Sequence, residues 1–414
     1  MPAGPGPGFG PLMVPPLQGF RIGRLPRITF GPGCRTEVPD IVASHGRRVL
    51  LVTGGRSFSD SPWSAELERG LAAAGIALVG RVTVSGEPGL AEVEAPVTRY
   101  RDAGVDVLLG IGGGAALDTT KAIAGLLRSG TSLLDHLEGV GRGAPYAGPA
   151  LPVVAVPTTA GTGSEATRNA VITERGPGGY KRSFRDERLV PADAVVDPDL
   201  LATAPRPLIA SNGLDALTQL LEAFTSQRAT PFTDGLARSG LTAARDGLLS
   251  WHEDPAGPDA AAARSRMAYA ALLSGVCLAN AGLGAVHGLA SPLGACLPIP
   301  HGMACGAVLW QTIHANVTAL EERATETPAL GRYAEVGRVL ADLPAGTTDE
   351  EARAALVDTL RHWVARLEIP GLAAFGMRPE HIPGIVADSP GSSMQTNPVA
   401  LSDAELAGIL GGAM

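Results

Sequence analysis

Cysteine is scarce in this sequence, long apolar runs are missing, and acidic residues outnumber basic ones. Only four cysteines occur in 414 residues, and none belongs to a CxxC pair. Such usage predicts free thiols in a reducing, cytoplasmic setting. No segment approaches the roughly 18 uninterrupted apolar residues of a transmembrane helix, so we expect no membrane partner. With 33 basic and 41 acidic residues the net charge is −8, which argues against nucleic acid as a partner.

Hydrophobic residues make up 45% of the chain. This is enough for a large core and excludes global disorder. The length predicts two or three domains, and the 54 glycines and 34 prolines predict many turns and close backbone contacts. Pro and Gly are concentrated in residues 1–20, which lack the basic start of a signal peptide. We expect a flexible arm there, or an arm that lies over a partner subunit.

Strand-like and helix-like segments alternate up to about residue 205, and helical periodicity dominates afterwards. Short apolar, β-branched runs that end in glycine are typical of buried parallel strands. The chain is therefore predicted to form an α/β domain over residues 21–205 and an all-helical domain over 206–414. Ser402 and Glu405 form a capping box that predicts the start of the last helix. Strands are expected at 47–53, 76–84, 105–111 and 153–156, and helices at 64–74 and 91–103.

A triple glycine, Gly112, Gly113 and Gly114, connects the strand expected at 105–111 to a helix that starts near Ala115 and carries Asp118. Glycine lets the backbone approach an anion closely, and the start of a helix presents free N–H groups. The turn therefore predicts a phosphate cradle. A tight βα turn without a ligand is the alternative, and the turn by itself does not decide between the two.

A second polar loop follows the strand expected at 153–156. It carries two glycines and four hydroxyls, those of Thr158, Thr159, Thr162 and Ser164. Hydroxyls can hydrogen-bond an extended polar ligand without adding charge. A Ser/Thr-rich surface loop is the alternative. Because both loops follow parallel strands, where open α/β sheets bind ligands, together they favour one shared ligand.

The helical half contains two carboxylates, Asp215 and Glu222 on one face of an expected helix, and two histidines, in a pattern that suggests a metal. Asp215 and Gln219 are one helical turn apart and share a face. His287 and His301 each stand beside glycine in apolar stretches. A lone buried histidine is more often structural, but imidazoles together with a carboxylate suit borderline divalent metals. Cys305, four residues after His301, could approach the same site but is interpreted as a packing residue.

Together these motifs resemble the iron-containing, group III alcohol dehydrogenases. The resemblance extends from about residue 26 to 411. It implies a dehydroquinate-synthase-like fold, in which an N-terminal Rossmann-like nucleotide-binding α/β domain and a C-terminal helical metal-binding domain flank the catalytic cleft. The motifs that carry it are the triple glycine with Asp118 and Lys121, the loop at 157–165, Asp215 with Thr218, His287-Gly288, and Pro300-His301-Gly302.

The resemblance also implies a set of metal ligands. The family holds its metal with one Asp and three His. Asp215, His287 and His301 match three of these positions, and Gln219 stands at the fourth. Ser291 stands where the family has a further histidine. Fe²⁺ or Zn²⁺ is the expected metal, held less tightly because an amide oxygen is a weaker donor. The expected catalytic residues are His301, His287 and Ser291.

The implied activity is hydride transfer between a nicotinamide cofactor and a small alcohol, aldehyde or ketone, with the metal as a Lewis acid. Lys181 aligns with a cofactor-contacting lysine of the family. Gly54 and Gly55 end the first strand and are followed by Arg56, not by a carboxylate. A carboxylate there would repel a 2′-phosphate, so we expect NADP(H) over NAD(H). Family members usually associate, so we expect a homodimer.

Two other functions stay open at this point. Dehydroquinate synthase has the same fold and is a lyase that uses its nicotinamide only transiently. Arg168, Arg182 and Arg185 are candidates for holding its phosphorylated acid substrate. The second alternative is a nucleotide-binding protein without catalysis, because two imidazoles of the family's site are absent. Net turnover of the cofactor distinguishes the dehydrogenase from both.

Overall fold

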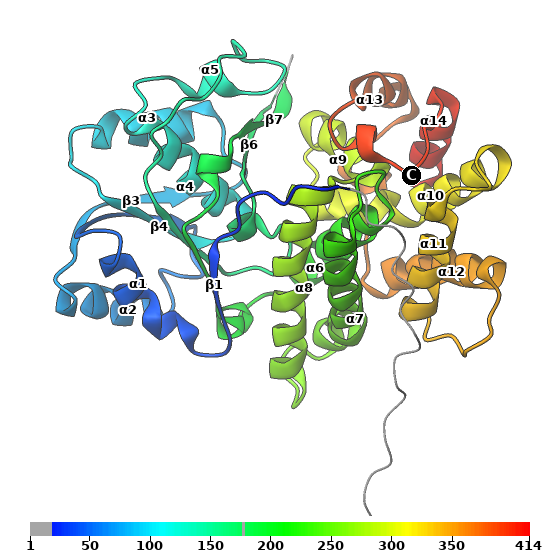
Figure 1. The fold of residues 1–414 in the computed structure, drawn as a ribbon, viewed down its shortest axis with the longest axis horizontal. Helices are drawn as coiled ribbons and strands as arrows, with labels where there is room; N and C mark the ends of the chain where they lie inside the picture. Colours follow the sequence, from blue (N-terminus) through cyan, green and yellow to red (C-terminus); the bar gives the residue numbers. More distant parts are fainter. Residues whose placement is uncertain (1–18, 176–178) are drawn as a thin grey trace, which may run out of the picture.

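A six-stranded parallel sheet forms the centre of the first half of the chain in this computed structural model, which describes residues 19–175 and 179–414 (Figure 1). The expected N-terminal arm therefore lies outside the described residues up to residue 18. Every neighbouring pair of strands in the sheet is parallel. The strand order is β1 (Arg27–Phe30), β8 (Asp193–Val196), β5 (Val153–Pro157), β4 (Val107–Gly112), β2 (Arg48–Gly54) and β3 (Ala77–Val84).

Alternating residues of the central strands pack against helices on opposite faces of this sheet. Leu50 and Leu108 share a core with α3 (Leu90–Tyr100) and α4 (Gly114–Leu126). Val49 and Leu109 share another with α1 (Val38–Ala43) and α2 (Pro62–Ala73). Because both faces are covered, these strands are continuous apolar runs instead of alternating ones.

The strands and helices expected in this half are confirmed to within three residues at each end. The short edge strand β1 and the antiparallel hairpin of β6 (Asn169–Glu174) and β7 (Tyr180–Arg185) were not anticipated from the sequence. β7 reads Tyr-Lys-Arg-Ser-Phe-Arg and has no apolar run. Its pairing with β6, which local periodicity does not reveal, is what makes it a strand.

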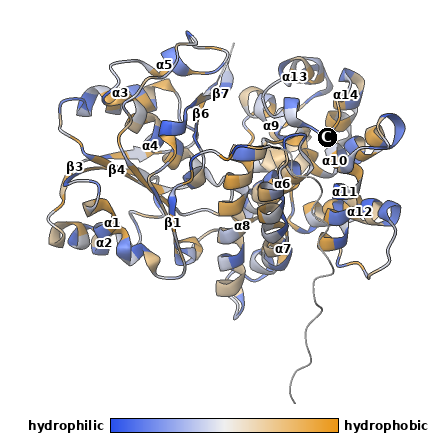
Figure 2. Ribbon diagram, in the orientation of Figure 1, coloured by the Kyte–Doolittle hydropathy of each residue, from blue (hydrophilic) through white to orange (hydrophobic). Residues whose placement is uncertain are grey.

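From Arg206 onward the described chain is helical (Figure 1). α6 (Arg206–Thr225) is buried along nearly its whole length, and apolar residues are frequent along α6 and α8 (Figure 2). The predicted capping box is confirmed, because Glu405 accepts from the Ser402 backbone N–H at 2.7 Å at the start of α14 (Asp403–Gly412). The other helices are α7 (Pro231–Glu253), α8 (Ala260–Ala281), α9 (Ala285–Cys296), α10 (His301–Arg323), α11 (Pro328–Leu340), α12 (Asp349–Arg366) and α13 (Ile382–Asp388).

Within the described residues, no single helix is long and apolar enough to cross a membrane. α8 and α9 meet the length and composition requirement only as a pair, and a bend of 100° separates them.

Candidate active site

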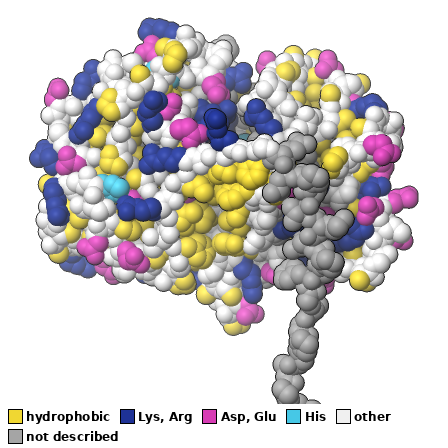
Figure 3. Space-filling view, in the orientation of Figure 1, with side chains coloured by type: hydrophobic (Ala, Val, Ile, Leu, Met, Phe, Trp, Pro, Cys, Tyr) yellow, Lys and Arg dark blue, Asp and Glu magenta, His cyan; other side chains and the backbone are white. Residues whose placement is uncertain are grey.

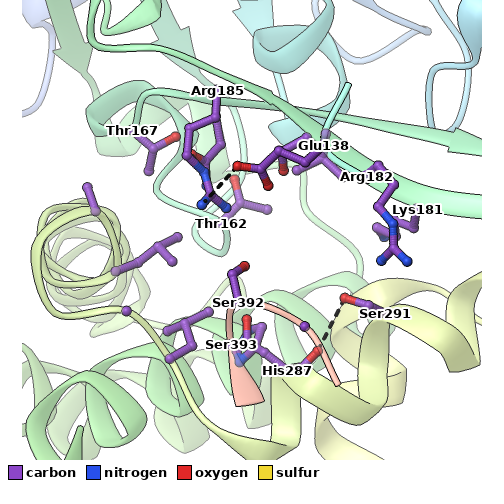
Figure 4. A pocket seen from close by; sticks show the side chains of 18 of the residues that line it. Glu138, Thr162, Thr167, Lys181, Arg182, Arg185, His287, Ser291, Ser392 and Ser393 are labelled. Carbon is purple, nitrogen blue, oxygen red and sulfur yellow. Dashed lines mark hydrogen bonds and ion pairs between the residues drawn. The ribbon is translucent and has the colours of Figure 1, made fainter. Parts of the chain in front are cut away.

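A cavity of about 680 Å³ lies where the α/β half meets the helical half. Figure 4 shows Thr162 and Lys181 on one side of it and His287 and Ser291 on the other. Most of the residues expected to form the site therefore face one space. Those that line the cavity are Gly114, Ala115, Asp118, Thr162, Ser164, Lys181, Asp215, Gln219, His287, Ser291 and His301.

The two glycine-rich loops touch each other beside this cavity. A Cβ atom at Gly114 would lie 2.7 Å from Cγ2 of Thr162, and one at Gly113 would lie 3.2 Å from Cγ2 of Thr159. At Gly114 only glycine leaves room for the neighbouring threonine, so the second loop packs directly on the start of α4.

The remaining predicted cofactor residues lie at the carboxyl ends of the neighbouring strands. The Thr158 backbone N–H donates to the Gly112 carbonyl at 3.0 Å. A Cβ atom at Gly112 would lie 2.9 Å from the backbone nitrogen of Gly54, which is followed by Gly55. The two loops and the end of β2 thus form one continuous edge of the sheet.

Asp118 ties the second loop to α4. Its carboxylate accepts from the Ser164 hydroxyl at 2.5 Å and from the Val171 backbone N–H at 3.0 Å. It also pairs with the Lys121 ammonium group at 3.0 Å. Lys121 is fully buried, and burial lowers its pKa against the opposing charge of Asp118. Asp118 therefore fixes the orientation of Ser164 from the edge of the cavity.

Helices α6, α9 and α10 bring four donor side chains together at the helical side of the cavity. Asp215 Oδ1 lies 3.1 Å from His287 Nε2 and 3.8 Å from His301 Nε2. Cys305 Sγ lies 3.8 Å from Asp215 Oδ1, 3.7 Å from His287 Nε2 and 3.9 Å from His301 Nε2. All four donor atoms fall within 4.8 Å of one another. We call these four side chains the donor cluster.

Glu222 orients the first histidine of the donor cluster. It accepts from His287 Nδ1 at 2.6 Å and from the Val286 backbone N–H at 2.7 Å. The carboxylate fixes the imidazole with Nδ1 as the donor, so Nε2 is the nitrogen that faces Asp215 and Cys305.

Gln219 and Ser291 lie beside the donor cluster. The amide oxygen of Gln219 lies 3.1 Å from the Ser274 hydroxyl. Ser291 donates to the His287 carbonyl at 3.2 Å (Figure 4). In this structure the amide oxygen of Gln219, which was expected to bind metal, is therefore engaged by Ser274.

The charges in the donor cluster follow from burial and from these contacts. Burial alone would raise the pKa of Asp215, but the hydrogen bond from His287 and the charge of His301 lower it to about 2. Burial, assisted by Lys181, lowers the pKa of His301 to about 3. Asp215 is thus ionised and His301 neutral at pH 7. For His287, burial is outweighed by its acidic neighbours, which raise its pKa well above the usual range.

The donor cluster fits a divalent metal. It offers one carboxylate oxygen, two imidazole nitrogens and one sulfur, which are atom types that transition metals bind in proteins. The buried Nδ1 of His301 has no hydrogen-bond partner among the described residues. Because a ligating imidazole nitrogen must be unprotonated, His287 would bind a metal through Nε2 with its remaining proton on Nδ1, toward Glu222.

Comparison with known proteins assigns the chain to a family. A model described as iron-containing alcohol dehydrogenase matches residues 26–198, and a model of the C-terminal part of the Fe-containing alcohol dehydrogenase family matches residues 209–414. The chain belongs to the iron-containing alcohol dehydrogenase family. It is therefore an oxidoreductase of that family, whose cofactors are a divalent metal and a nicotinamide dinucleotide.

Named members of the family match over most of their length. The chain is 31% identical to lactaldehyde reductase of Escherichia coli (strain K12) over 364 residues, 86% of this chain and 89% of that protein. It is 30% identical to NAD-dependent methanol dehydrogenase of Bacillus methanolicus over 359 residues, 86% and 90% of the two chains. The crystal structure of a 1,3-propanediol oxidoreductase superposes with a TM-score of 0.85 at 26% identity, covering 96% and 100%. The expected fold, a parallel α/β half followed by a helical half, is confirmed.

Two of the three arginines considered for a lyase of this fold already have carboxylate partners. Arg168 pairs with Glu187, and Arg185 pairs with Glu138 at 3.2 Å. Arg182, the third, also lines the cavity, so it is the family match and not the charge of the cavity that decides for a dehydrogenase. Lys181 lies in strand β7 and pairs with Glu87 at 2.6 Å.

Two residues of this family member's site, Cys305 and Glu222, were noted in the sequence, but their roles were not assigned from it. Cys305 was interpreted as a packing residue, yet its sulfur meets three donor atoms. The available signal was the spacing of His301 and Cys305, one turn apart at the start of α10, which repeats the spacing of Asp215 and Gln219 on α6. No local signal identifies Glu222 as the partner of His287, because the two are 65 residues apart in the chain.

Proposed function

We propose that this protein transfers hydride between a nicotinamide dinucleotide and a small alcohol or aldehyde in the cavity between its two halves. The observation that carries the proposal is the lining of that cavity. The glycine-rich turn at Gly114 and the donors Asp215, His287 and His301 all face it. A cofactor held by the turn and a metal held by the donors would thus meet the same substrate.

When bound, the metal acts as a Lewis acid on the substrate oxygen, and the nicotinamide exchanges the hydride. The residues of the chain position both groups. Asp118 accepts the hydrogen bond from Ser164, so the lone pairs of that hydroxyl are free to accept from a ribose hydroxyl. Backbone N–H groups at the start of α4 would hold the pyrophosphate. Asp215, His287 and His301 would hold the metal, and Glu222 would keep His287 in the ligating tautomer.

Ser291 is proposed to contact the substrate. Its hydroxyl lines the cavity and donates to the His287 carbonyl at 3.2 Å. A rotation about one bond turns that hydrogen toward the cavity, where it can hydrogen-bond the substrate oxygen. Gln219, also proposed from the sequence as a metal ligand, lines the cavity, and its amide oxygen accepts from Ser274 with one of its two lone pairs.

The test is an initial-rate assay of NADH and NADPH oxidation with small aldehydes, before and after exhaustive chelation. We expect net cofactor turnover, its loss on chelation and its return when Zn²⁺ or Fe²⁺ is added back. A lyase would consume its substrate without net cofactor turnover. Full activity after chelation would refute the metal-assisted mechanism.

We propose NADP(H) as the preferred cofactor, supported by the end of β2. Gly54 and Gly55 are followed by Arg56, whose side chain is exposed and lies 3.6 Å from Asp60. The 2′-phosphate would compete with Asp60 for this guanidinium. Higher kcat/KM with NADPH than with NADH, reduced in Arg56→Ala, is expected. A clear preference for NADH in the unmodified enzyme would contradict it.

We also propose a homodimer formed along β1. This strand is at the edge of the sheet, and its Ile28 and Phe30 are 44% and 39% exposed. Phe30 packs edge-on against Tyr269 of α8, and Figure 3 shows hydrophobic side chains gathered in the middle of the face that carries these elements. Exposed apolar edge strands favour pairing with another chain.

A cytoplasmic location is proposed from the cysteines. All four, Cys34, Cys277, Cys296 and Cys305, are free thiols in the structure, as expected in a reducing compartment. Cell fractionation should recover the protein with a cytoplasmic marker enzyme. Recovery with an extracytoplasmic marker would contradict the proposal.

A further inference from the structure

We propose that Cys305 is the fourth protein ligand of the metal and that the resulting donor set favours Zn²⁺ over Fe²⁺. The inference rests on the proposed function, because it concerns the metal of that same site. It replaces the amide of Gln219, the donor expected from the sequence, with a thiolate from a different helix.

The distances within the donor cluster are close to those of a tetrahedral zinc site. Zinc lies about 2.0–2.3 Å from N, O and S ligands, so the ligand atoms of a tetrahedron stand about 3.3–3.8 Å apart. The pairs of Asp215 Oδ1 with His287 and His301 measure 3.1 and 3.8 Å. The three distances to Cys305 Sγ are 3.7, 3.8 and 3.9 Å. The two histidine nitrogens lie within 4.8 Å of each other, and the five other distances place the sulfur at the position of a fourth ligand.

The surroundings of Cys305 agree with a ligand. Its side chain is fully buried, and its sulfur contacts three donor atoms of the cluster. Cys277 is equally buried, but its sulfur contacts a backbone carbonyl, that of Thr233, at 3.6 Å. Such a contact is ordinary for a buried thiol, whereas three ligand-type neighbours are not.

Gln219 is engaged elsewhere. Its amide oxygen lies 3.1 Å from the hydroxyl of Ser274, on α8. Gln219 also hydrogen-bonds the Asp215 carboxylate, for which its amide N–H group is the donor. The sulfur of Cys305, by contrast, already lies beside the other three donor atoms.

A thiolate changes which metal is favoured. Sulfur is a soft donor and, with imidazole, suits Zn²⁺, whereas sets of oxygen and nitrogen alone accept a wider range of divalent ions. On ligation the thiol proton passes to solvent and the sulfur lone pair forms the bond to the metal, with no change of oxidation state.

The direct experiment needs no variant. The full-length protein is loaded with Zn²⁺ alone, and X-ray absorption at the zinc edge is recorded. We expect one sulfur at about 2.3 Å together with nitrogen and oxygen ligands at about 2.0–2.2 Å. A zinc shell without sulfur would overturn the proposal.

Cobalt spectroscopy with variants identifies the sulfur. Co²⁺ added to the chelated protein should produce a thiolate-to-cobalt charge-transfer band in the near ultraviolet. The band should be absent in Cys305→Ser and present in Gln219→Ala. Cys277→Ser and Cys296→Ser, a buried and an exposed cysteine outside the cluster, are the matched controls and should keep it. Persistence of the band in Cys305→Ser would overturn the proposal.

Metal affinity gives a third readout. In competition with a chelator, Cys305→Ser should lose at least about tenfold in zinc affinity, while unchanged affinity would count against the proposal. If zinc is bound without sulfur and chelation abolishes activity, the proposed function stands and this inference fails. If sulfur is bound but activity survives chelation, the cysteine ligand stands and the proposed function fails.

Discussion

His301 is the side chain through which the two proposals are most directly tested, because it stands at the start of α10 and faces both the cavity and the donor cluster. His301→Ala should lower kcat/KM for aldehyde reduction by at least about 100-fold, the upper range seen when the support of a metal ligand is lost. NADPH binding, measured by fluorescence titration, should be unchanged, because the glycine-rich loops lie across the cavity.

The matched control is His314→Ala, an exposed histidine on the same helix, which should retain full activity. Equal loss of nucleotide binding and of activity in His301→Ala would indicate a structural role for His301 instead.

Glu222 supports the site through His287 and should behave differently from a ligand. The carboxylate of Glu222 accepts from His287 with one oxygen and from the Val286 backbone N–H with the other. Glu222→Gln replaces one of these oxygens with an NH₂ group, so one of the two donors would then face another donor. We expect a 10- to 100-fold loss of metal affinity, roughly the range for such supporting residues, and a loss of stability of about 1–3 kcal/mol. Chelator competition and urea unfolding measure the two. Glu322→Gln, at an exposed position of α10, is the control, and wild-type metal affinity in Glu222→Gln would contradict the assignment.

Glu165 makes stability depend on pH. It is buried in the cofactor loop, and burial raises its pKa to about 7. The folded state therefore holds the proton more tightly than the unfolded state does. The protonated carboxyl of Glu165 contributes its full free energy of stabilisation below about pH 4.3, the pKa in the unfolded chain. This contribution declines as the pH rises and is lost once the pH exceeds the folded-state pKa of about 7. Glu165→Gln should remove up to about 3 kcal/mol of this pH dependence.

Urea unfolding between about pH 5 and pH 8 measures that slope. The exposed Glu66→Gln should leave it unchanged. A variant at Glu165 with the same slope as the wild type would show that this carboxyl is not the source.

At the scale of elements, the cofactor loop rests directly on helix α8. A Cβ atom at Gly275 would lie 2.1 Å from the carbonyl oxygen of Gly163, and Gly163 has a φ of +59°. Gly275→Ala therefore has to push the loop and the helix apart. We expect a loss of about 1–3 kcal/mol, typical of overpacking, and a higher KM for the cofactor because the loop moves.

A helical glycine in open space provides the control for that change. At Gly235 of α7, no atom lies within 4 Å of the position that a Cβ atom would take. Gly235→Ala should therefore stabilise the protein slightly, by up to about 1 kcal/mol. Thermal unfolding compares the two variants. Equal stability for both would show that the loop and α8 separate at no cost.

Helices and strands were predictable from the sequence where the local pattern of apolar residues determines them. Strands that form only by pairing with another strand were missed. β2, β4 and β5 are buried apolar runs, and their ends were predicted closely. β7 is polar and exists because it pairs with β6, and β1 is a four-residue strand defined by its pairing with β8. Pairing between strands that are distant in the chain produces no recognisable pattern in the sequence of a short strand.

The donor cluster shows the same limit within the site. Asp215, His287 and His301 carry motifs that a sequence reveals. The identity of the fourth metal ligand depends on the packing of α6 against α10 and on the hydrogen bond between Ser274 of α8 and Gln219. Cys305 was placed among packing residues because a cysteine on an apolar helix face is ordinary unless its neighbours are known.

For the whole molecule, association is the property to measure. Ile28→Lys with Phe30→Lys places charge along the free side of β1, where a second copy is proposed to dock. Sedimentation should show a dimer for the wild type and a monomer for this double variant. Leu134→Lys, on α5 (Leu133–His136) and 39% exposed like Phe30, should remain dimeric. A dimer that survives the double variant would place the interface elsewhere.

The donor cluster draws its members from three helices, and their positions in the chain run from Asp215 to Cys305. An ion held there acts as a cross-link that the unfolded chain does not have, so folding of the helical half becomes linked to the free concentration of that ion. At about 100 times the dissociation constant the linkage amounts to about 2.7 kcal/mol. A cell that limits zinc would thereby change how much of this protein survives proteolysis, even before a substrate is present.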